Sequence, residues 1–200
     1  MSIDPDSLDP DPFRQFAAWL AEAAAAGLRL PEAFALATAD AGGTPSVRML
    51  LLRGHGADGF SFYTNRASRK GRDLLVNPVA AALFHWPALD RQVRVAGSVV
   101  LIDDEESAAY FAGRPRGSQL AAWGSDQGAE IDSRAALEAR VAVAAARFAD
   151  GPVPLPPNWG GYRLIPDRFE FWLSRADRLH DRVEYLLAAG GSWTSRRLQP

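Results

Sequence analysis

The feature that most constrains the fold is the alternation of short, strand-like segments with tight turns. Segments rich in apolar and aromatic residues, bounded by glycine or proline, are typical of antiparallel sheets. We expect strands at residues 34–39, 47–52, 60–63, 80–86, 92–102, 162–164, 168–173, 179–187 and 193–198. We expect helices at residues 13–26, 68–76, 103–111 and 133–148. The strand–helix–strand alternation of a doubly wound sheet is absent, so the sequence predicts an α+β fold, an antiparallel barrel with peripheral helices.

Length and composition exclude several classes of protein. The chain has 200 residues, no cysteine and a formal net charge of −2. This length fits one domain, which we place at residues 11–200 after a flexible acidic segment at residues 1–10. Without cysteine there is no disulfide scaffold, thiolate zinc site, iron–sulfur cluster or cysteine nucleophile. The acidic balance argues against a nucleic-acid partner, and the lack of a long apolar run or a signal-like start predicts a cytoplasmic protein with no membrane partner.

Three patterns that could suggest other chemistry are better explained by structure. Residues 54–59 match G-x-G-x-x-G, but a dinucleotide-binding turn opens a helix, and a strand-like segment follows here, so we predict a hairpin loop. The acidic run at residues 103–106 begins a helix, where carboxylates complement the helix dipole by ~0.3–1 kcal/mol each. His55, His85 and His180 lie too far apart in the sequence for a local ligand pair, and no metal site is predicted.

The helix that begins at Ser68 has cations where a helix prefers anions. Arg69, Lys70 and Arg72 lie in its first turn, and Lys70 is the single lysine among 22 basic residues. Cations there oppose the helix dipole by a few tenths of a kcal/mol each, a cost recovered when an anion binds at the helix start. Residues 63–65 precede the helix and would add hydroxyl and amide groups. The segment is interpreted as an anion site, with a solvated basic turn as the alternative.

Two further clusters favour anionic ligands. Residues 110–118 combine a phenol, guanidinium groups and a hydroxyl around a proline-started turn, a set that suits a phosphate monoester. On a strand, the two-residue period would put Arg178, His180 and Arg182 on one face, suited to an anionic or electron-rich ligand. Two phosphate-like sites in one chain imply a phosphorylated cofactor and a phosphorylated substrate.

In combination, these motifs resemble the pyridoxamine/pyridoxine 5′-phosphate oxidases, which are FMN-dependent split-barrel proteins. The matching motifs run in family order from about residue 11 to 200: RMLLLR at 48–53, FYTN at 62–65, SRK at 68–70, RQV at 91–93, RPR and SQ within 114–119, EFW at 170–172 and RLHDR at 178–182. Each motif alone is weak, and their combination is specific. The resemblance implies an antiparallel split β-barrel and a homodimer with FMN at the subunit interface.

The resemblance also implies roles for single residues. The residues implied to contact FMN are Arg48, Met49, Leu50, Leu51, Leu52, Arg53, Tyr63, Thr64, Arg69, Lys70, Gln92, Gln127, Gly128, Trp172 and Arg182. The residues implied to clamp the substrate phosphate are Arg53, Tyr110, Arg114 and Ser118. Arg178 and His180 are implied to bind the substrate over its pyridine ring and to act in catalysis.

The implied reaction is the oxidation of pyridoxine or pyridoxamine 5′-phosphate to pyridoxal 5′-phosphate, with dioxygen reduced to hydrogen peroxide. Two alternatives stay open: a flavin oxidase for another aromatic substrate, as in phenazine biosynthesis, and a non-catalytic flavin- or pyridoxal-phosphate-binding protein. The chain departs from the family pattern at Arg53, where many members have Lys, at Gly128, where Ser is common, and at Leu30, where Asp is frequent. The acidic residues 1–10 replace a basic segment that closes over substrate in some members.

Overall fold

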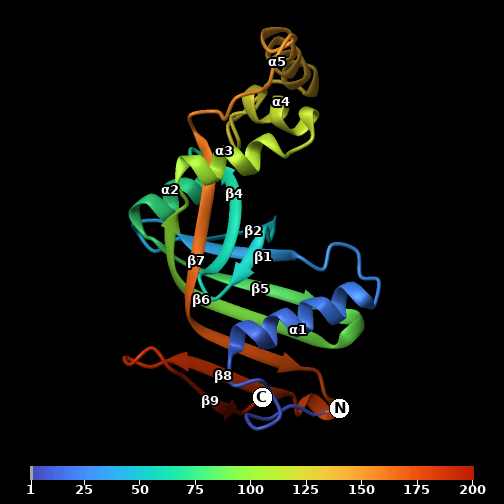
Figure 1. The fold of residues 1–200 in the computed structure, drawn as a ribbon, viewed down its shortest axis with the longest axis vertical. Helices are drawn as coiled ribbons and strands as arrows, with labels where there is room; N and C mark the ends of the chain where they lie inside the picture. The colour runs from blue at the N-terminus through green and yellow to red at the C-terminus, as the bar shows by residue number, and fades with distance from the viewer. Residues whose placement is uncertain (1) are drawn as a thin grey trace.

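Nine strands of one antiparallel sheet and five α-helices make up the computed structural model, which describes residues 2–200 (Figure 1). The strands are β1 (Ala33–Ala39), β2 (Pro45–Leu51), β3 (Gly54–Gly56), β4 (Gly59–Asn65), β5 (Val79–Trp86), β6 (Arg91–Leu101), β7 (Trp159–Leu173), β8 (Asp181–Leu187) and β9 (Trp193–Leu198). The helices are α1 (Pro12–Ala25), α2 (Arg69–Val76), α3 (Asp104–Ala112), α4 (Arg116–Gly124) and α5 (Arg134–Arg147), with short 3₁₀ helices at Pro87–Leu89 and Ala176–Arg178.

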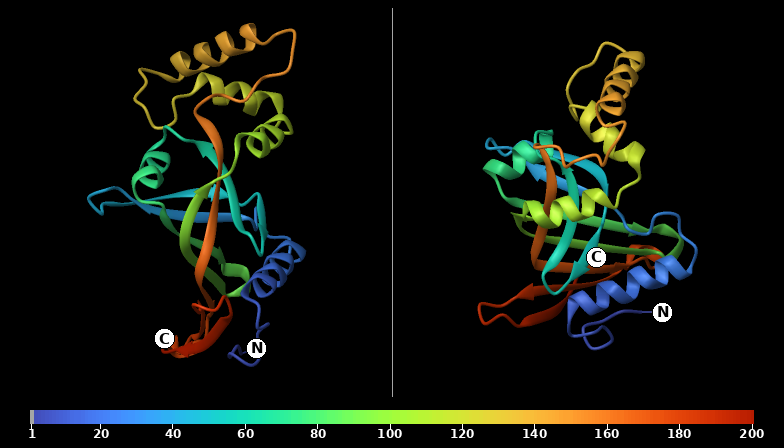
Figure 2. Two further views of the ribbon diagram at one scale, coloured as in Figure 1. Left: turned by 60° about the vertical axis from the view of Figure 1, so that its left-hand side comes forward. Right: turned by 45° about the horizontal axis from the view of Figure 1, so that its top comes forward.

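The long strand β7 connects the two ends of the sheet because its halves have different neighbours. Residues 159–164 pair with β4, and residues 168–173 pair with β8, which in turn pairs with β9. β6 runs beside both halves, and the remaining order is β2-β1-β5-β6. The sheet curls around its core, and the prediction of an antiparallel barrel with peripheral helices is confirmed. Figure 2 shows α4 and α5 at the end of the molecule opposite β8 and β9.

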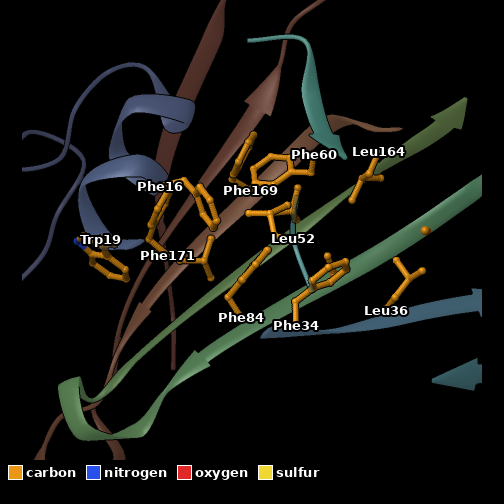
Figure 3. Close-up of a cluster of buried hydrophobic side chains, with 14 of the residues drawn as sticks. Phe16, Trp19, Phe34, Leu36, Leu52, Phe60, Phe84, Leu164, Phe169 and Phe171 are labelled. Atoms are coloured by element: carbon orange, nitrogen blue, oxygen red, sulfur yellow. The ribbon is translucent and has the colours of Figure 1, made fainter. Parts of the chain in front are cut away.

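The core is a cluster of aromatic side chains between the sheet and α1 (Figure 3). Phe16 of α1 is fully buried, and its ring lies 4.8 Å from the rings of both Phe60 and Phe84. Trp19 meets Phe171 edge-on at 5.2 Å. The three-residue spacing of Phe16 and Trp19 puts both on one face of the helix. This face covers the aromatic core, so α1 closes one side of the barrel.

Most predicted elements are confirmed within one or two residues, and three predictions about elements are wrong. The G-x-G-x-x-G pattern is the β3–β4 hairpin, as predicted. Residues 162–173 form one continuous part of β7 rather than two strands, because the sheet absorbs Pro166 at a register shift opposite Gly97. A helix, α4, follows Pro115 in place of a simple turn, and Pro115 provides no side-chain cap that would have signalled it. The strand expected at residues 179–187 begins only at Asp181.

The acidic N-terminal segment packs on the last two strands. Ile3 is 2% exposed, and its carbonyl accepts a hydrogen bond from Arg197 at 3.1 Å. The Tyr185 hydroxyl donates to the Asp9 carbonyl at 2.8 Å. These contacts join residues 2–10 to β8 and β9, and the flexibility expected for this segment stays a prediction. Within residues 2–200, no helix is long and apolar enough to cross a membrane, and no group of three acidic or histidine side chains could hold a metal ion.

Leu30 has a left-handed backbone, with φ of 56°, and its side chain is 48% exposed. A leucine in this conformation costs roughly 1–2 kcal/mol, whereas asparagine tolerates it. We expect Leu30→Asn to raise the free energy of unfolding by ~0.5–1 kcal/mol, measured by chemical denaturation at fixed protein concentration. Leu179, which is also exposed but has φ of −83°, provides the control, because Leu179→Asn should give no gain. Equal effects at the two positions would contradict the backbone argument.

Candidate functional site

The anion site predicted at the start of α2 is built around a buried cation. Lys70 is 6% exposed, and its ammonium group donates to Thr64 Oγ1 at 3.1 Å, Ser68 Oγ at 3.1 Å and Gln127 Oε1 at 3.0 Å. Within residues 2–200, no carboxylate forms an ion pair or a hydrogen bond with Lys70. Burial, and to a lesser extent the nearby charge of Arg48, lowers the pKa of Lys70 to about 8. A buried cation with neutral partners is costly, and a bound anion would offset that cost.

Local structure explains how Lys70 comes to this position. Ser68 has an extended backbone and caps α2, as the sequence predicted, by accepting a hydrogen bond from the Gly71 N–H. Its hydroxyl also donates to the Asn65 carbonyl at 2.7 Å, which fixes the turn between β4 and the helix. Gln127 comes from the loop between α4 and α5, and Gly128 after it has φ of 90°, a conformation that disfavours the serine common in the family. Glycine adopts this left-handed backbone without the strain that a side chain would add.

A cavity of about 340 Å³ opens beside this cluster. It is lined by Leu50, Tyr63, Thr64, Asn65, Arg114, Ser118, Ala121, Ala122, Ser125, Gln127 and Trp159. Six residues implied by the resemblance line it: Leu50, Tyr63, Thr64, Arg114, Ser118 and Gln127. Asn65 lines it too, as expected for the amide before α2, whereas Ser125 and Trp159 have no role assigned from the sequence. Trp159 starts β7 after a proline-rich stretch, and its position next to β4 depends on strand pairing that no local pattern reveals.

A second cavity, of about 570 Å³, contains the whole predicted phosphate clamp. Arg53, Tyr110, Arg114 and Ser118 all line it, and Arg114 and Ser118 also line the first cavity. The clamp residues come from the connection between β2 and β3, from α3, from the turn after α3 and from α4. The structure thus brings together four residues that are spread over 66 positions of the chain, from 53 to 118.

Arg114 has an incomplete set of partners. Its guanidinium lies over the Trp159 ring at 4.7 Å, and its Nη1 atom is buried with no hydrogen-bond partner among residues 2–200. Burial lowers the pKa of Arg114, and the positive charge of Arg53 adds to that effect, although the Tyr110 hydroxyl opposes it. Two guanidinium groups that face one cavity, one with an unused donor, form a site for an anion with several oxygen acceptors.

Tyr63 and Tyr110 connect the two cavities. Their rings stack at 3.9 Å with an interplanar angle of 8°, and Tyr63 lies parallel to Trp159 at 5.7 Å. The Tyr63 hydroxyl donates to Glu106 at 3.2 Å. Burial, followed by the Glu106 charge, raises the pKa of Tyr63 to about 12, so the phenol stays neutral at physiological pH. This neutral aromatic stack can pack against a planar ligand without repelling an anionic one.

A second group of residues of the implied site lies at the other end of β7. Gln92, Trp172 and Arg182 are register neighbours on β6, β7 and β8. The imidazole of His180 lies 4.6 Å from the Trp172 ring and accepts a hydrogen bond from the Arg175 N–H at 3.1 Å. These side chains form a row across three strands on one face of the sheet.

The prediction that Arg178 and His180 lie on a strand with Arg182 is wrong. Arg178 ends a 3₁₀ turn, and both Asp177 and Arg178 have left-handed backbones, with φ of 56° and 60°. β8 begins at Asp181, so the two-residue period does not reach back to them. They lie in the loop before β8, where the His180 ring contacts Trp172.

The two groups of residues do not meet within one chain. Tyr63 pairs with Gly161, and Trp172 lies 11 residues further along β7, roughly 35 Å of strand. Of the run from 48 to 53, Leu50 and Arg53 line the cavities, Leu52 is buried in the core, and the Met49 side chain is 64% exposed. A ligand that contacts both groups would need a second copy of the chain.

Comparison with known proteins identifies the family of this chain. A family model described as pyridoxamine 5′-phosphate oxidase matches residues 20–148, and one described as the pyridoxine 5′-phosphate oxidase C-terminal dimerisation region matches residues 159–200. The chain is 52% identical to the pyridoxine/pyridoxamine 5′-phosphate oxidase of Paraburkholderia phymatum, over 100% of this chain and 93% of that protein. It is 53% identical to the protein of the same name from Cupriavidus metallidurans, over 96% and 90% of the two chains.

Two solved structures resemble the fold. PhzG from Burkholderia lata 383, in complex with tetrahydrophenazine-1-carboxylic acid, is 34% identical with a TM-score of 0.91 and covers 99% of this chain and 98% of its own. A pyridoxamine 5′-phosphate oxidase-related, FMN-binding protein from Nostoc punctiforme is 22% identical with a TM-score of 0.74, over the full length of both chains. The second likeness establishes the fold alone.

Proposed function

Because the chain belongs to the pyridoxamine 5′-phosphate oxidase family, we propose that it oxidises pyridoxine or pyridoxamine 5′-phosphate to pyridoxal 5′-phosphate, with FMN as cofactor and dioxygen as electron acceptor. The observation that carries the proposal is the convergence of Arg53, Tyr110, Arg114 and Ser118 on one cavity. This cavity shares a wall with the one beside Lys70, so a phosphorylated substrate and a phosphorylated cofactor fit side by side.

The chemistry of the donors fits FMN. Lys70 is a buried cation that lacks a carboxylate partner in residues 2–200, and the N-terminus of α2 with its Ser68 cap lies beside it. Together they provide the positive charge and N–H donors that suit one phosphate group, and the sequence lacks the glycine-rich turn of a dinucleotide fold. When bound, FMN supplies the two-electron acceptor for the reaction. The protein holds the phosphate, orients the substrate and excludes water.

A homodimer completes the site. The C-terminal region matches the family's dimerisation region. We propose that the row of Gln92, Trp172 and Arg182 from one copy faces the Lys70 end of the other, which places FMN at the subunit interface. Arg178 and His180, in the loop beside this row, would then lie over the substrate ring. Phosphorylated ligands do not cross membranes unaided, which favours the cytoplasm as the location.

The purified protein tests this proposal directly. We expect it to be yellow, to release FMN rather than FAD on heating, and to produce peroxide from pyridoxine 5′-phosphate in air. Chromatography of the released flavin and a peroxide assay against a panel of B6 vitamers measure these outcomes. A colourless protein that fails to take up added FMN would refute the proposed cofactor.

The similarity to PhzG favours a second candidate function, a flavin oxidase for a phenazine precursor. The higher identity to the B6 oxidases and the four-residue phosphate clamp favour the phosphorylated vitamer. The same peroxide assay, run with a reduced phenazine carboxylic acid, distinguishes the two. Turnover of the phenazine alone would favour the second candidate. A protein that binds pyridoxine 5′-phosphate without reducing its flavin would be a carrier.

The clamp gives a prediction for Arg114. Its unused Nη1 donor is expected to bind the substrate phosphate, and loss of a hydrogen bond to a charged group costs ~1.5–3 kcal/mol. Arg114→Ala should therefore raise the KM for pyridoxine 5′-phosphate by about tenfold or more while the flavin stays bound. Arg116 provides the matched control, because its guanidinium donates to the carbonyls of Phe148 and Gly151. Loss of FMN from Arg114→Ala, with an unchanged KM, would assign the clamp to the cofactor instead.

A further inference from the structure

A buried carboxylate lies beside the proposed cofactor-phosphate site and has no role in the function described above. Asp73, on α2, is 4% exposed. Its Oδ2 atom accepts hydrogen bonds from Thr38 Oγ1 at 2.6 Å and from Ser46 Oγ at 3.0 Å. The same oxygen lies 3.8 Å from Nη2 of Arg48. One carboxylate oxygen thus joins a helix to the two strands β1 and β2.

The two hydroxyls connect Asp73 to Arg48. Nη1 of Arg48 donates to Thr38 Oγ1 at 2.8 Å, and Nη2 donates to Ser46 Oγ. A hydroxyl has one proton to donate and lone pairs that accept. Because an ionised carboxylate only accepts, it draws the protons of both hydroxyls toward itself and leaves their lone pairs for Arg48. Asp73 therefore determines the direction of both hydroxyls, and through them the position of the guanidinium.

Arg48 belongs to the same electrostatic cluster as Lys70. Lys70 and Asp73 are both buried and lie three residues apart on α2, which puts them on one face of the helix, and Arg48 approaches Asp73 to 3.8 Å. The positive charge of Arg48 also contributes to the lowered pKa of Lys70. Nη1 of Arg48 also donates to the Leu36 carbonyl at 3.1 Å, which leaves the guanidinium little freedom. Two neighbouring cations repel each other in the absence of an anion, and the Asp73 carboxylate offsets part of that repulsion. The arrangement is a preorganised one, since Arg48 is held in place before any ligand arrives.

We propose that Asp73 is a positioning residue for cofactor recognition: through Thr38 and Ser46 it holds Arg48 beside Lys70, and the preference of this protein for phosphorylated over unphosphorylated flavin depends on it. The inference rests on the proposed function, because it assumes that the anion at this site is the FMN phosphate. It assigns no contact between Asp73 and the ligand.

The test compares two flavins that differ only in the phosphate. Flavin-free protein is titrated with FMN and with riboflavin, and the quenching of flavin fluorescence gives both dissociation constants. Asp73→Asn should reduce the preference for FMN over riboflavin by about tenfold, equivalent to ~1.4 kcal/mol, and leave riboflavin binding within about twofold of wild type. Thr38→Val, which breaks the connection and keeps the Asp73 charge, should reduce the preference in the same direction.

Asp40→Asn is the matched control. Asp40 lies in the turn between β1 and β2 and interacts electrostatically with Arg69. Its carboxylate accepts hydrogen bonds from the Gly42 and Thr44 N–H groups and forms none with Arg48. Removal of the Asp40 charge should leave the preference for FMN over riboflavin unchanged. In an Arg48→Ala background, Asp73→Asn should add less than about a twofold effect, because the residue it positions is gone.

Each other outcome overturns the inference. Tighter FMN binding by Asp73→Asn would mean that Asp73 acts only as a repelling charge. Equal weakening for both flavins would mean a purely structural role. Failure of the wild-type protein to bind FMN at all would refute the proposed cofactor, and this result is distinguishable from wild-type binding with an unchanged preference in Asp73→Asn.

Discussion

Arg178→Ala is expected to lower kcat/KM for pyridoxine 5′-phosphate by at least about tenfold, or ~1.4 kcal/mol, with the flavin still bound. Arg178 lies in the loop before β8, and no ion pair or hydrogen bond of its side chain is seen within residues 2–200. Its guanidinium is thus available to the substrate. Because the proposed role is to align the pyridine ring in the transition state, kcat should fall more than binding. Anaerobic reduction of the flavin by substrate, followed as bleaching of the yellow band, measures the step itself.

The backbone at Arg178 calls for a second variant. Its φ of 60° suits glycine, so Arg178→Gly removes the side chain without adding strain. The Gly and Ala variants should lose activity equally if the guanidinium is what matters. Recovery of activity in Arg178→Gly would instead assign the effect to the loop conformation. His180→Asn should give a smaller loss than Arg178→Ala, since a neutral hydrogen-bonding group remains beside Trp172. An unchanged bleaching rate in Arg178→Ala would place the chemistry elsewhere.

Lys70→Ala is expected to weaken FMN binding by ~1.5–3 kcal/mol, about 10- to 150-fold, the range for loss of a hydrogen bond to a charged group. Lys70→Met keeps more of the packing and should weaken binding similarly, whereas Lys70→Glu should weaken it further by placing like charges together. Arg72, on the same helix, is the control: it is exposed and donates to the Ala67 carbonyl, so Arg72→Ala should change the dissociation constant less than about twofold. Unchanged FMN affinity in Lys70→Ala would make Lys70 a structural residue.

The pH dependence of FMN binding follows from the same residue. Burial lowers the pKa of Lys70 from 10.5 to about 8, so the flavin-free protein carries this charge below pH 8 and loses it above. A phosphate favours the charged form. FMN affinity should therefore fall as the pH rises through about 8, and this fall should be absent in Lys70→Met. The pKa of Lys70 is lower in the folded state than in the unfolded chain, so between pH 8 and 10.5 the unfolded chain binds the proton more strongly. Deprotonation of Lys70 in this range therefore does not itself destabilise the flavin-free fold.

Local sequence signals predict where most strands and helices of this fold occur, but they predict less well where one element ends and the next begins. Glycine- and proline-bounded apolar segments mark most strands because each strand must end where the chain turns. Pro166 lacks the N–H that sheets use, so it predicts a break, yet β7 continues past it through a register shift with β6. Helix α4 is missed because Pro115 caps it without a side-chain signal. In both cases the pairing or packing partner, which is distant in sequence, decides the outcome.

In the candidate site, too, the sequence predicts the local features but not the contacts between residues that are distant in the chain. The basic start of α2 and its Ser68 cap are local features, and the sequence predicts both. The contact of Gln127 with Lys70 joins residues 57 positions apart and has no local signal. Two successive left-handed residues, Asp177 and Arg178, end the two-residue period on which the predicted cationic face depends. The Asp73 network is equally hidden, because its three partners come from β1 and β2, far from α2 in sequence.

The two ends of β7 have a consequence for mixed dimers. The Lys70 group and the Trp172 group of the proposed site belong to opposite ends of this strand, whose course Figure 1 shows, so in the proposed homodimer each chain would contribute different halves to two different active sites. A chain defective only at Lys70 and a chain defective only at Arg182 would each be inactive as a homodimer. Paired with each other, they would form one site that carries both defects and one that carries neither. Two inactive proteins would thereby restore an active one, with at most one working centre per dimer.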